Sequence, residues 1–196
     1  MTLDMLGANN WERPVYFTSI GSTNTLNLDE YFMLEGFAYR LVPYKTGTTS
    51  GLIDTDVMYD RLMNKMKWGN MNDPKINIDH TIERTTKILR IRKTFARLAI
   101  ALNEEGKKDQ ANEVMARCRT IMPYNLYPMG YFDIDFAEAY YSIGDSASGD
   151  EALRAIAEIS IQELNFFFTL SDEQFEKVNI EAQMALATMS RTINVA

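Results

Sequence analysis

The sequence predicts a mainly α-helical protein, in which a stack of helical hairpins follows a small α/β lead-in. Two observations lead to this prediction. From about residue 88 onward, apolar residues recur at spacings of three and four, which places them on one face of successive helices. Before that, short β-rich runs bounded by proline and glycine predict two strands within the first 43 residues.

The clearest helical hairpin ends at Pro123, and its first helix is expected to run from an N-cap at Asp79 to Gly106. Its first helix has five apolar residues on one face: Ile88, Ile91, Phe95, Leu98 and Leu102. Gly106 ends this helix, because glycine accepts the left-handed conformation found at helix C-termini. A second helix has Ala111, Val114, Met115 and Cys118 on its inner face and is closed by Pro123.

The spacing within this hairpin resembles the tetratricopeptide repeat, whose pattern is W-x2-L-G-x2-Y, then A-x3-F, then P. The corresponding residues here are Phe95, Leu98, Ala99, Leu102, Ala111, Met115 and Pro123. Small residues at Ala99 and Ala111 allow the two helices to approach closely. Since the signature Trp and Tyr are missing, we interpret the repeat as degenerate.

A single hairpin cannot bury its apolar face alone, so the pattern requires neighbours. A second hairpin follows, with the residues Phe136, Ala137, Tyr140, Gly144, Ala152 and Ile156 in equivalent positions. A third apolar helix begins at Ser171, a residue favoured at helix N-caps. Its predicted inner face comprises Phe175, Val178, Ala182, Ala185 and Met189. The sequence therefore predicts a helical-repeat domain over residues 53–196.

Residues 1–43 form the α/β lead-in. Its strands are expected at residues 15–18 and 37–42, with a helix-like segment at 29–36 between them. Because two short strands need a further partner, we expect an incomplete sheet. Residues 44–52, rich in Gly, Ser and Thr, are predicted to be a linker.

Composition excludes several classes of function. The net charge of −7 argues against a nucleic-acid partner, because phosphates require a basic surface. No apolar run is long enough for a membrane span. The chain has one histidine, His80, and one cysteine, Cys118, and we predict a helix terminus for the first and the core for the second. We find no catalytic constellation and expect no metal or cofactor.

Binding is therefore the function class to consider, and repeat stacks of this kind bind through the concave face lined by the first helix of each hairpin. The residues expected there are Lys93, Ile100, Asn103, Tyr131, Glu138 and Tyr141. Tyrosines with a lysine and an asparagine suit an extended peptide or a glycan. The alternative is that further helices cover this face.

Charged residues form two other groups. Arg84, Lys87, Arg90, Lys93 and Arg97 step by three or four residues, which makes a basic stripe on one helix. It is typical of a solvated face, with contact to lipid head groups or a pyrophosphate as the alternative. Asp133, Asp135 and Glu138 gather three carboxylates, which we interpret as a solvated helix start rather than a cation site or acid–base pair.

Two stretches carry a family resemblance. One runs from Leu3 to Phe17 and ends in NWERPVYF; the other, from Leu28 to Pro43, reads LDEYFMLEGFAYRLVP. Together they resemble the C-terminal soluble region of an uncharacterised family of multi-pass membrane proteins of Bacteroides-group bacteria. Members of that family are similar, in their membrane half, to protein O-mannosyltransferases, which use lipid-linked sugars.

The resemblance implies a soluble tail on the periplasmic side of the inner membrane, whose first partner is its own upstream membrane domain. The presumed catalytic carboxylates of the family lie upstream, so no catalytic residue carries over to this chain. We therefore expect a non-catalytic accessory domain that binds a peptide or glycan acceptor or positions the membrane domain. The alternative is a free-standing helical-repeat adaptor that binds a peptide.

Overall fold

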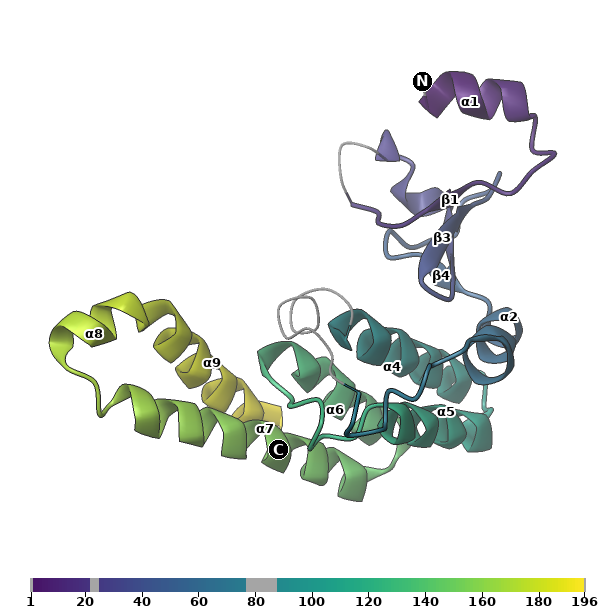
Figure 1. Cartoon of the computed structure of the whole chain (residues 1–196). Coiled ribbons are helices and arrows are strands. Elements are labelled where there is room, and N and C mark those ends of the chain that lie inside the picture. The colour runs from purple at the N-terminus through teal and green to yellow at the C-terminus, as the bar shows by residue number, and fades with distance from the viewer. Residues whose placement is uncertain (1, 22–24, 77–87, 196) are drawn as a thin grey trace. The chain divides into compact units, whose positions relative to one another are not determined.

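The computed structural model describes residues 2–21, 25–76 and 88–195, which form eight α-helices, four strands and short 3₁₀ and π segments within these ranges. The predicted fold class, mainly α with a small α/β lead-in, is confirmed (Figure 1). The chain divides into two compact units, Met1–Met66 and Lys67–Ala196.

The first unit is built on a four-stranded sheet of order β1-β3-β2-β4. Helix α1 (Thr2–Asn9) precedes β1 (Tyr16–Phe17), and β2 (Phe32–Glu35) and β3 (Ala38–Leu41) form an antiparallel hairpin. β4 (Leu52–Ile53) pairs in parallel with β2. The hairpin turns at Gly36, whose φ of 73° lies in the region that glycine favours.

Two expectations for this unit need correction. The segment 29–36 is not helix-like throughout, because only the 3₁₀ turn η2 (Asp29–Tyr31) is helical and strand β2 follows it. The sheet also has four strands where we expected two, and its additional strands, β2 and β4, come from this same chain. Since β4 pairs with β2, the end of the predicted linker 44–52 belongs to the sheet. The first compact unit extends beyond this linker to Met66.

A short helical segment completes the unit. Asp54 caps α2 (Thr55–Tyr59) by accepting a hydrogen bond from the Val57 amide at 3.1 Å. The chain then continues into η3 (Asp60–Lys65), a π-helix. Met58 and Leu62 on these segments are fully buried, as is Phe32 on the sheet. The described core of the unit is thus small and lies between the sheet and these two segments.

Gly51, just before β4, allows a test of this packing. Its φ is +81°, and a Cβ there would lie 2.8 Å from the Tyr39 ring; Gly47 has a similar φ of +77° but open space around it. We expect Gly47→Ala to destabilise the unit by about 1 kcal/mol through backbone strain alone. Gly51→Ala should cost roughly 1–3 kcal/mol more, because the ring must move. Thermal unfolding followed through the amide signals of the strands measures both, and equal losses would contradict the predicted clash.

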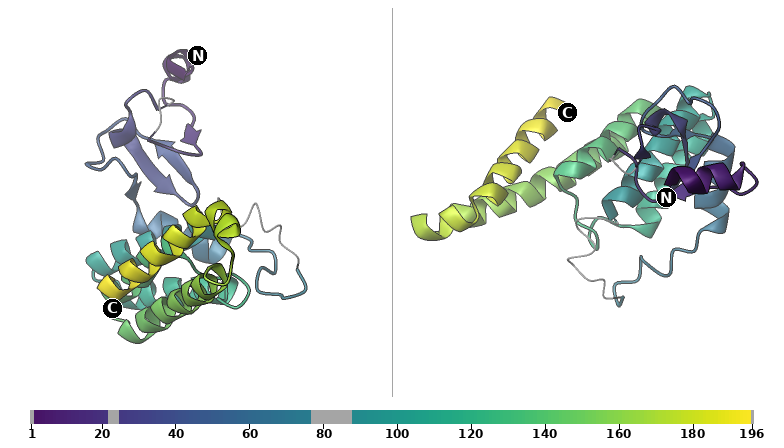
Figure 2. Two further views of the ribbon diagram at one scale, coloured as in Figure 1. Left: turned by 90° about the vertical axis from the view of Figure 1, so that its left-hand side faces the viewer. Right: turned by 90° about the horizontal axis from the view of Figure 1, so that it is seen from above.

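The second unit is helical (Figures 1 and 2). Its elements are α4 (Ile88–Glu104), α5 (Lys108–Ile121), η5 (Tyr131–Asp133), α6 (Ile134–Ile143), α7 (Ser146–Phe167), α8 (Asp172–Lys177) and α9 (Asn179–Val195). Helix α4 packs against α5 and α6, α6 packs against α7, and α9 returns along α7. Gly106 and Gly144 end α4 and α6 with φ values of 78° and 84°, as the spacing of the sequence predicts.

The core of this unit follows the predicted helical periodicity. The predicted inner-face residues of the two hairpins that are buried are Phe95, Leu98, Ala99, Leu102, Ala111, Val114, Met115, Cys118, Phe136, Ala137, Tyr140, Ala152 and Ile156. Trp68 packs on Phe95 with ring centroids 5.4 Å apart. The tetratricopeptide assignment itself stays a prediction.

Helices α7, α8 and α9 form a hairpin with a small core of its own. Phe167, Ala182 and Ala185 are buried there, and Leu164, Leu170, Phe175 and Val178 pack against them. The predicted third helix is divided into α8 and α9 near Val178. Ala182 and Ala185 lie on its inner face as predicted, and α7 and α9 run side by side in both views of Figure 2.

Candidate functional site

The predicted concave-face residues lie on α4, η5 and α6, but they do not form one open surface. Lys93 is exposed on α4. The Asn103 side chain donates a hydrogen bond to the Ser142 carbonyl at 3.0 Å, which joins the C-terminal ends of α4 and α6. Tyr141 donates to an Asp150 carboxylate oxygen at 2.6 Å, and its ring lies over Gly149 on α7. Burial, with this hydrogen bond, raises the pKa of Tyr141 to about 12.

Tyr131 and Glu138 meet around an arginine from α9. The Arg191 guanidinium forms an ion pair with Asp135, lies 3.5 Å from a Glu138 carboxylate oxygen and stands 5.5 Å from the Tyr131 ring centre. The hydrogen bond to Asp135 is the main cause of the raised pKa of Arg191. A further helix therefore lies against this part of the predicted face.

The basic stripe is described only in part. Arg90 and Lys93 are exposed on α4 and Arg97 is half-buried, whereas Arg84 and Lys87 lie outside the described residues. His80 and the expected N-cap Asp79 also lie outside them. The described part of the stripe is on the outward side of α4, away from the buried Phe95 and Leu98.

The sequence did not reveal the charged pair that is buried most deeply among the described residues of the second unit. Arg92 on α4 is 1% exposed and Asp133 at the start of α6 is 3% exposed, and their nearest side-chain atoms lie 3.0 Å apart. The contact is an ion pair without the alignment of a hydrogen bond. Arg92 donates to the Tyr127 carbonyl at 2.5 Å, and Asp133 accepts from the Gly130 amide at 2.9 Å.

This pair corrects our expectation that Asp133 belongs to a solvated helix start. Asp133 is buried, because the guanidinium of Arg92 compensates its charge, while Asp135 and Glu138 pair with Arg191. One signal in the sequence could have identified Arg92 as a buried residue. Arg92 precedes Phe95 by three residues and Ala99 by seven, so it lies on the apolar face of the helix and not on the basic stripe.

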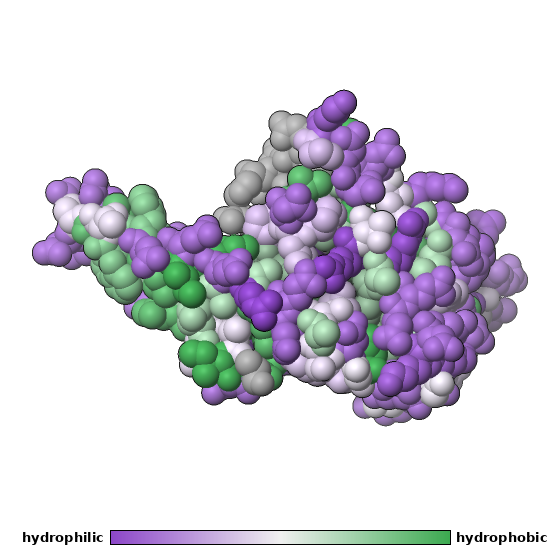
Figure 3. All heavy atoms as spheres, turned by 90° about the horizontal axis from the view of Figure 1, so that it is seen from below, coloured by the Kyte–Doolittle hydropathy of each residue, from purple (hydrophilic) through white to green (hydrophobic). Residues whose placement is uncertain are grey.

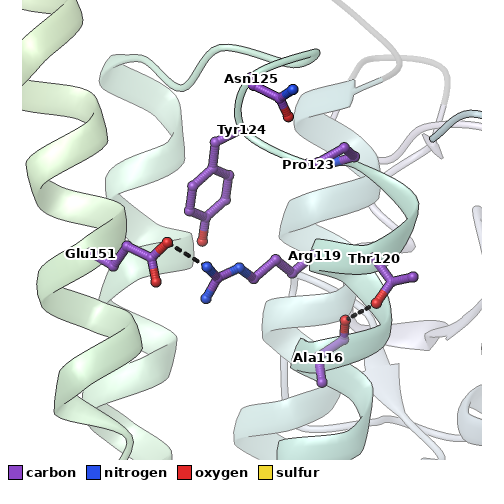
Figure 4. Close-up of a pocket in the computed structure, with 7 residues that line it drawn as sticks. All are labelled: Ala116, Arg119, Thr120, Pro123, Tyr124, Asn125 and Glu151. Carbon is purple, nitrogen blue, oxygen red and sulfur yellow. Dashed lines mark hydrogen bonds and ion pairs between the residues drawn. The ribbon is translucent and has the colours of Figure 1, made fainter. Parts of the chain in front are cut away.

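A groove lies on the outer side of this polar core. It has a volume of about 580 Å³ and is lined by Ala116, Arg119, Thr120, Pro123, Tyr124, Asn125 and Glu151. Arg119 of α5 and Glu151 of α7 form an ion pair across it, and the Tyr124 hydroxyl points toward that pair (Figure 4). Two guanidinium groups lie near the centre of the Tyr124 ring, those of Arg92 at 6.0 Å and Arg119 at 5.4 Å.

The groove is lined mostly by polar side chains. Its lining contains no histidine or cysteine, and the Thr120 hydroxyl donates to the Ala116 carbonyl at 3.0 Å. Burial raises the pKa of the Tyr124 phenol, so the phenol stays protonated and can donate a hydrogen bond. An aromatic ring beside an amide, a carboxylate and a guanidinium suits a polar chain such as a peptide or a saccharide.

Cys118 is buried beside the polar core, as the sequence predicts. Burial raises the pKa of its thiol far above the usual range, so the thiolate that would be reactive is suppressed. Among the described residues, no three His, Cys, Asp or Glu side chains come together as a metal site would require.

The α7–α9 hairpin exposes many apolar side chains. They are Ile161, Phe166, Phe168, Ile180, Met184, Leu186 and Ile193, and apolar residues reach the surface along this end of the unit in Figure 3. Exposed apolar patches of this kind mark interaction surfaces. No helix in the described part of the chain combines the length and the apolarity of a membrane span.

Residues 1–57 match the family model of TMEM260-associated domain 2. The match covers the sheet of the first unit and the beginning of α2, and it fits a domain of a membrane protein family. It also contains both stretches that carry the resemblance noted above. No curated protein and no solved structure matches the chain.

Proposed function

We propose that this chain is a non-catalytic accessory domain of a glycosyltransferase-like membrane protein, located on the periplasmic side of the inner membrane. The observation that carries the proposal is the match of residues 1–57 to a domain named for its association with TMEM260. The resemblance of residues 3–43 to the tails of mannosyltransferase-like proteins supplies the glycosyltransferase part.

The second unit would then be the part that contacts partners. Its groove at Arg119, Tyr124 and Glu151 offers polar and aromatic groups to a peptide or glycan acceptor. The exposed apolar side chains of the α7–α9 hairpin supply a surface for the upstream membrane domain or another protein. These binding features support the accessory role.

An immunoblot of fractionated source cells, using antiserum against this chain, tests the proposal. We expect a band far above 22.5 kDa that pellets with membranes, and protease added to spheroplasts should remove its epitope without lysis. A cytoplasmic protein of known abundance serves as the lysis control. A soluble band at 22.5 kDa, or turnover of a sugar donor by the isolated chain, would refute the proposal.

The groove also supports a second candidate, a free-standing helical-repeat adaptor that binds a peptide. A soluble band in the same immunoblot would favour it. Arg119→Gln and Asn125→Ala should then weaken binding of a captured peptide, because both side chains line the groove. Arg117→Gln, the same change at an exposed residue of α5 that does not line the groove, is the matched control.

A further inference from the structure

The sheet of the first unit has two chemically different faces. In the strand register, Tyr16 and Met33 are both opposite Arg40, and Glu35 is opposite Ala38. Since side chains alternate along a strand, Tyr16, Met33, Glu35 and Arg40 share one face. The other face is apolar, where the ring of Phe32 packs edge-on against those of Phe17 and Tyr39.

Glu35 is the centre of the polar face. Its side chain is only 5% exposed, and its Oε2 atom accepts hydrogen bonds from the Tyr16 hydroxyl at 2.8 Å and from Arg61 Nη2 at 2.7 Å. Arg40 Nη1 lies 3.3 Å from its Oε1 atom. The π-helix η3 brings Arg61 to the sheet. Such helices are rare and occur frequently at functional sites.

Two guanidinium groups thus share one carboxylate, which leaves an excess positive charge in a chain whose net charge is −7. The arginine side chains are 47% and 36% exposed, so solvent and solutes reach them. Each guanidinium has five N–H donors. Within the described residues, the contacts with Glu35 and Tyr16 occupy Nη1 of Arg40 and Nη2 of Arg61.

Apolar groups lie beside these arginines. Tyr16 is exposed on the same face, and Leu52 of β4, opposite Met33, is exposed as well. The Tyr44 hydroxyl donates to the Met33 sulfur at 3.1 Å, and Tyr44 is 52% exposed. The surface therefore combines a positive centre with an apolar margin.

We propose that Arg40 and Arg61 bind the phosphate group of an organic phosphate whose apolar part lies along Tyr16, Tyr44 and Leu52. The guanidinium fork matches the oxygen geometry of phosphate, and charge-assisted hydrogen bonds of this type are the stronger ones. Glu35 holds both arginines in place, so little side-chain entropy is lost on binding. This inference concerns the first unit alone and stands independently of the proposed function.

Titration of the whole chain with inorganic phosphate, at constant ionic strength maintained with chloride, tests this site. We expect saturable shifts of the backbone amide signals of Tyr16, Arg40 and Arg61. Arg40→Gln should weaken the apparent affinity about fivefold or more, because it removes a charged donor. Lys45→Gln is the matched control, because it removes one positive charge from the same unit. Lys45 pairs with Glu30 at 2.6 Å, and its replacement should change the phosphate affinity less than about twofold.

Arg40→Lys keeps the positive charge beside Glu35 and replaces Arg40→Gln as the test variant if Arg40→Gln does not fold. It should still bind phosphate more weakly than the unchanged chain, since an ammonium group lacks the forked geometry of a guanidinium. Vesicles of phosphatidylcholine, with and without phosphatidic acid, distinguish the source of the phosphate. Arg40-dependent binding to the acidic vesicles indicates a lipid headgroup, and binding of soluble phosphate alone indicates a soluble ligand. Absence of saturable shifts, or equal weakening by Arg40→Gln and Lys45→Gln, would overturn the proposal.

Discussion

Replacing Arg92 by methionine is expected to destabilise the second unit by roughly 3–5 kcal/mol, which is the cost of leaving a buried charge without its partner. Asp133 would stay buried opposite a thioether, and within the described residues it would keep the hydrogen bond from the Gly130 amide alone. The Tyr127 carbonyl would also lose the donor that now lies 2.5 Å away. Denaturant unfolding followed by Trp68 fluorescence in a Trp11→Phe background reports on this unit, because Trp68 packs on Phe95.

Two further variants separate the buried charge from a general effect of the substitution. Lys93→Met makes the same kind of change at the next residue, where the side chain is exposed, and should alter stability by less than about 0.5 kcal/mol. The double variant Arg92→Met/Asp133→Asn removes both charges and keeps an acceptor for Gly130. It should recover at least about 1 kcal/mol of the loss. Equal stability of Arg92→Met and Lys93→Met would show that the ion pair contributes nothing.

Arg92 also shows where the sequence stops being informative. Helical spacing correctly assigned the buried residues around it, because a periodicity of 3.6 is a local property of one helix. Its partner, Asp133, belongs to the next hairpin, so no local pattern encodes the pairing. Two acidic neighbours, Asp135 and Glu138, looked equivalent to Asp133 in the sequence, yet only Asp133 enters the core.

The small sheet was predicted in part for a related reason. β2 contains Met33, Leu34 and Glu35, which are strong helix formers, and its pairing with β3 across Gly36 outweighs that preference. β4 has two residues, too few for any periodicity, and becomes a strand only by pairing with β2. Tertiary contacts thus determine the strands, whereas the helices could be predicted from their own sequences.

The candidate sites depend on contacts of the same long-range kind. The predicted face rested on the register of α4 and α6, and the register was right about which residues are buried. The register of α4 and α6 could not predict that α9 packs back against α6 and brings Arg191 onto Tyr131 and Glu138. The groove at Tyr124 was missed because its lining combines α5, the loop after it and α7. The polar sheet face was missed because Arg61 reaches Glu35 only through the π-helix.

Replacing Phe95 by alanine should produce the other large effect, a loss of roughly 3–5 kcal/mol in the stability of the second unit. Phe95 is 0% exposed on α4, and removing its ring leaves a cavity bordered by Trp68, whose ring centre lies 5.4 Å away. The fluorescence of Trp68 should also change in the folded state, because the indole loses its contact with the Phe95 ring.

The matched control is Phe168→Ala, the same substitution at a residue of the same unit that is 67% exposed. It should change stability by less than about 0.5 kcal/mol. The strand amides of the first unit should keep their hydrogen-exchange protection in Phe95→Ala, since the two units are separately compact. If Phe95→Ala costs no more than Phe168→Ala, Phe95 does not hold the hairpin together. If the strand amides lose protection as well, the two units unfold as one cooperative body, and the stability of the sheet with its phosphate site depends on the helical unit.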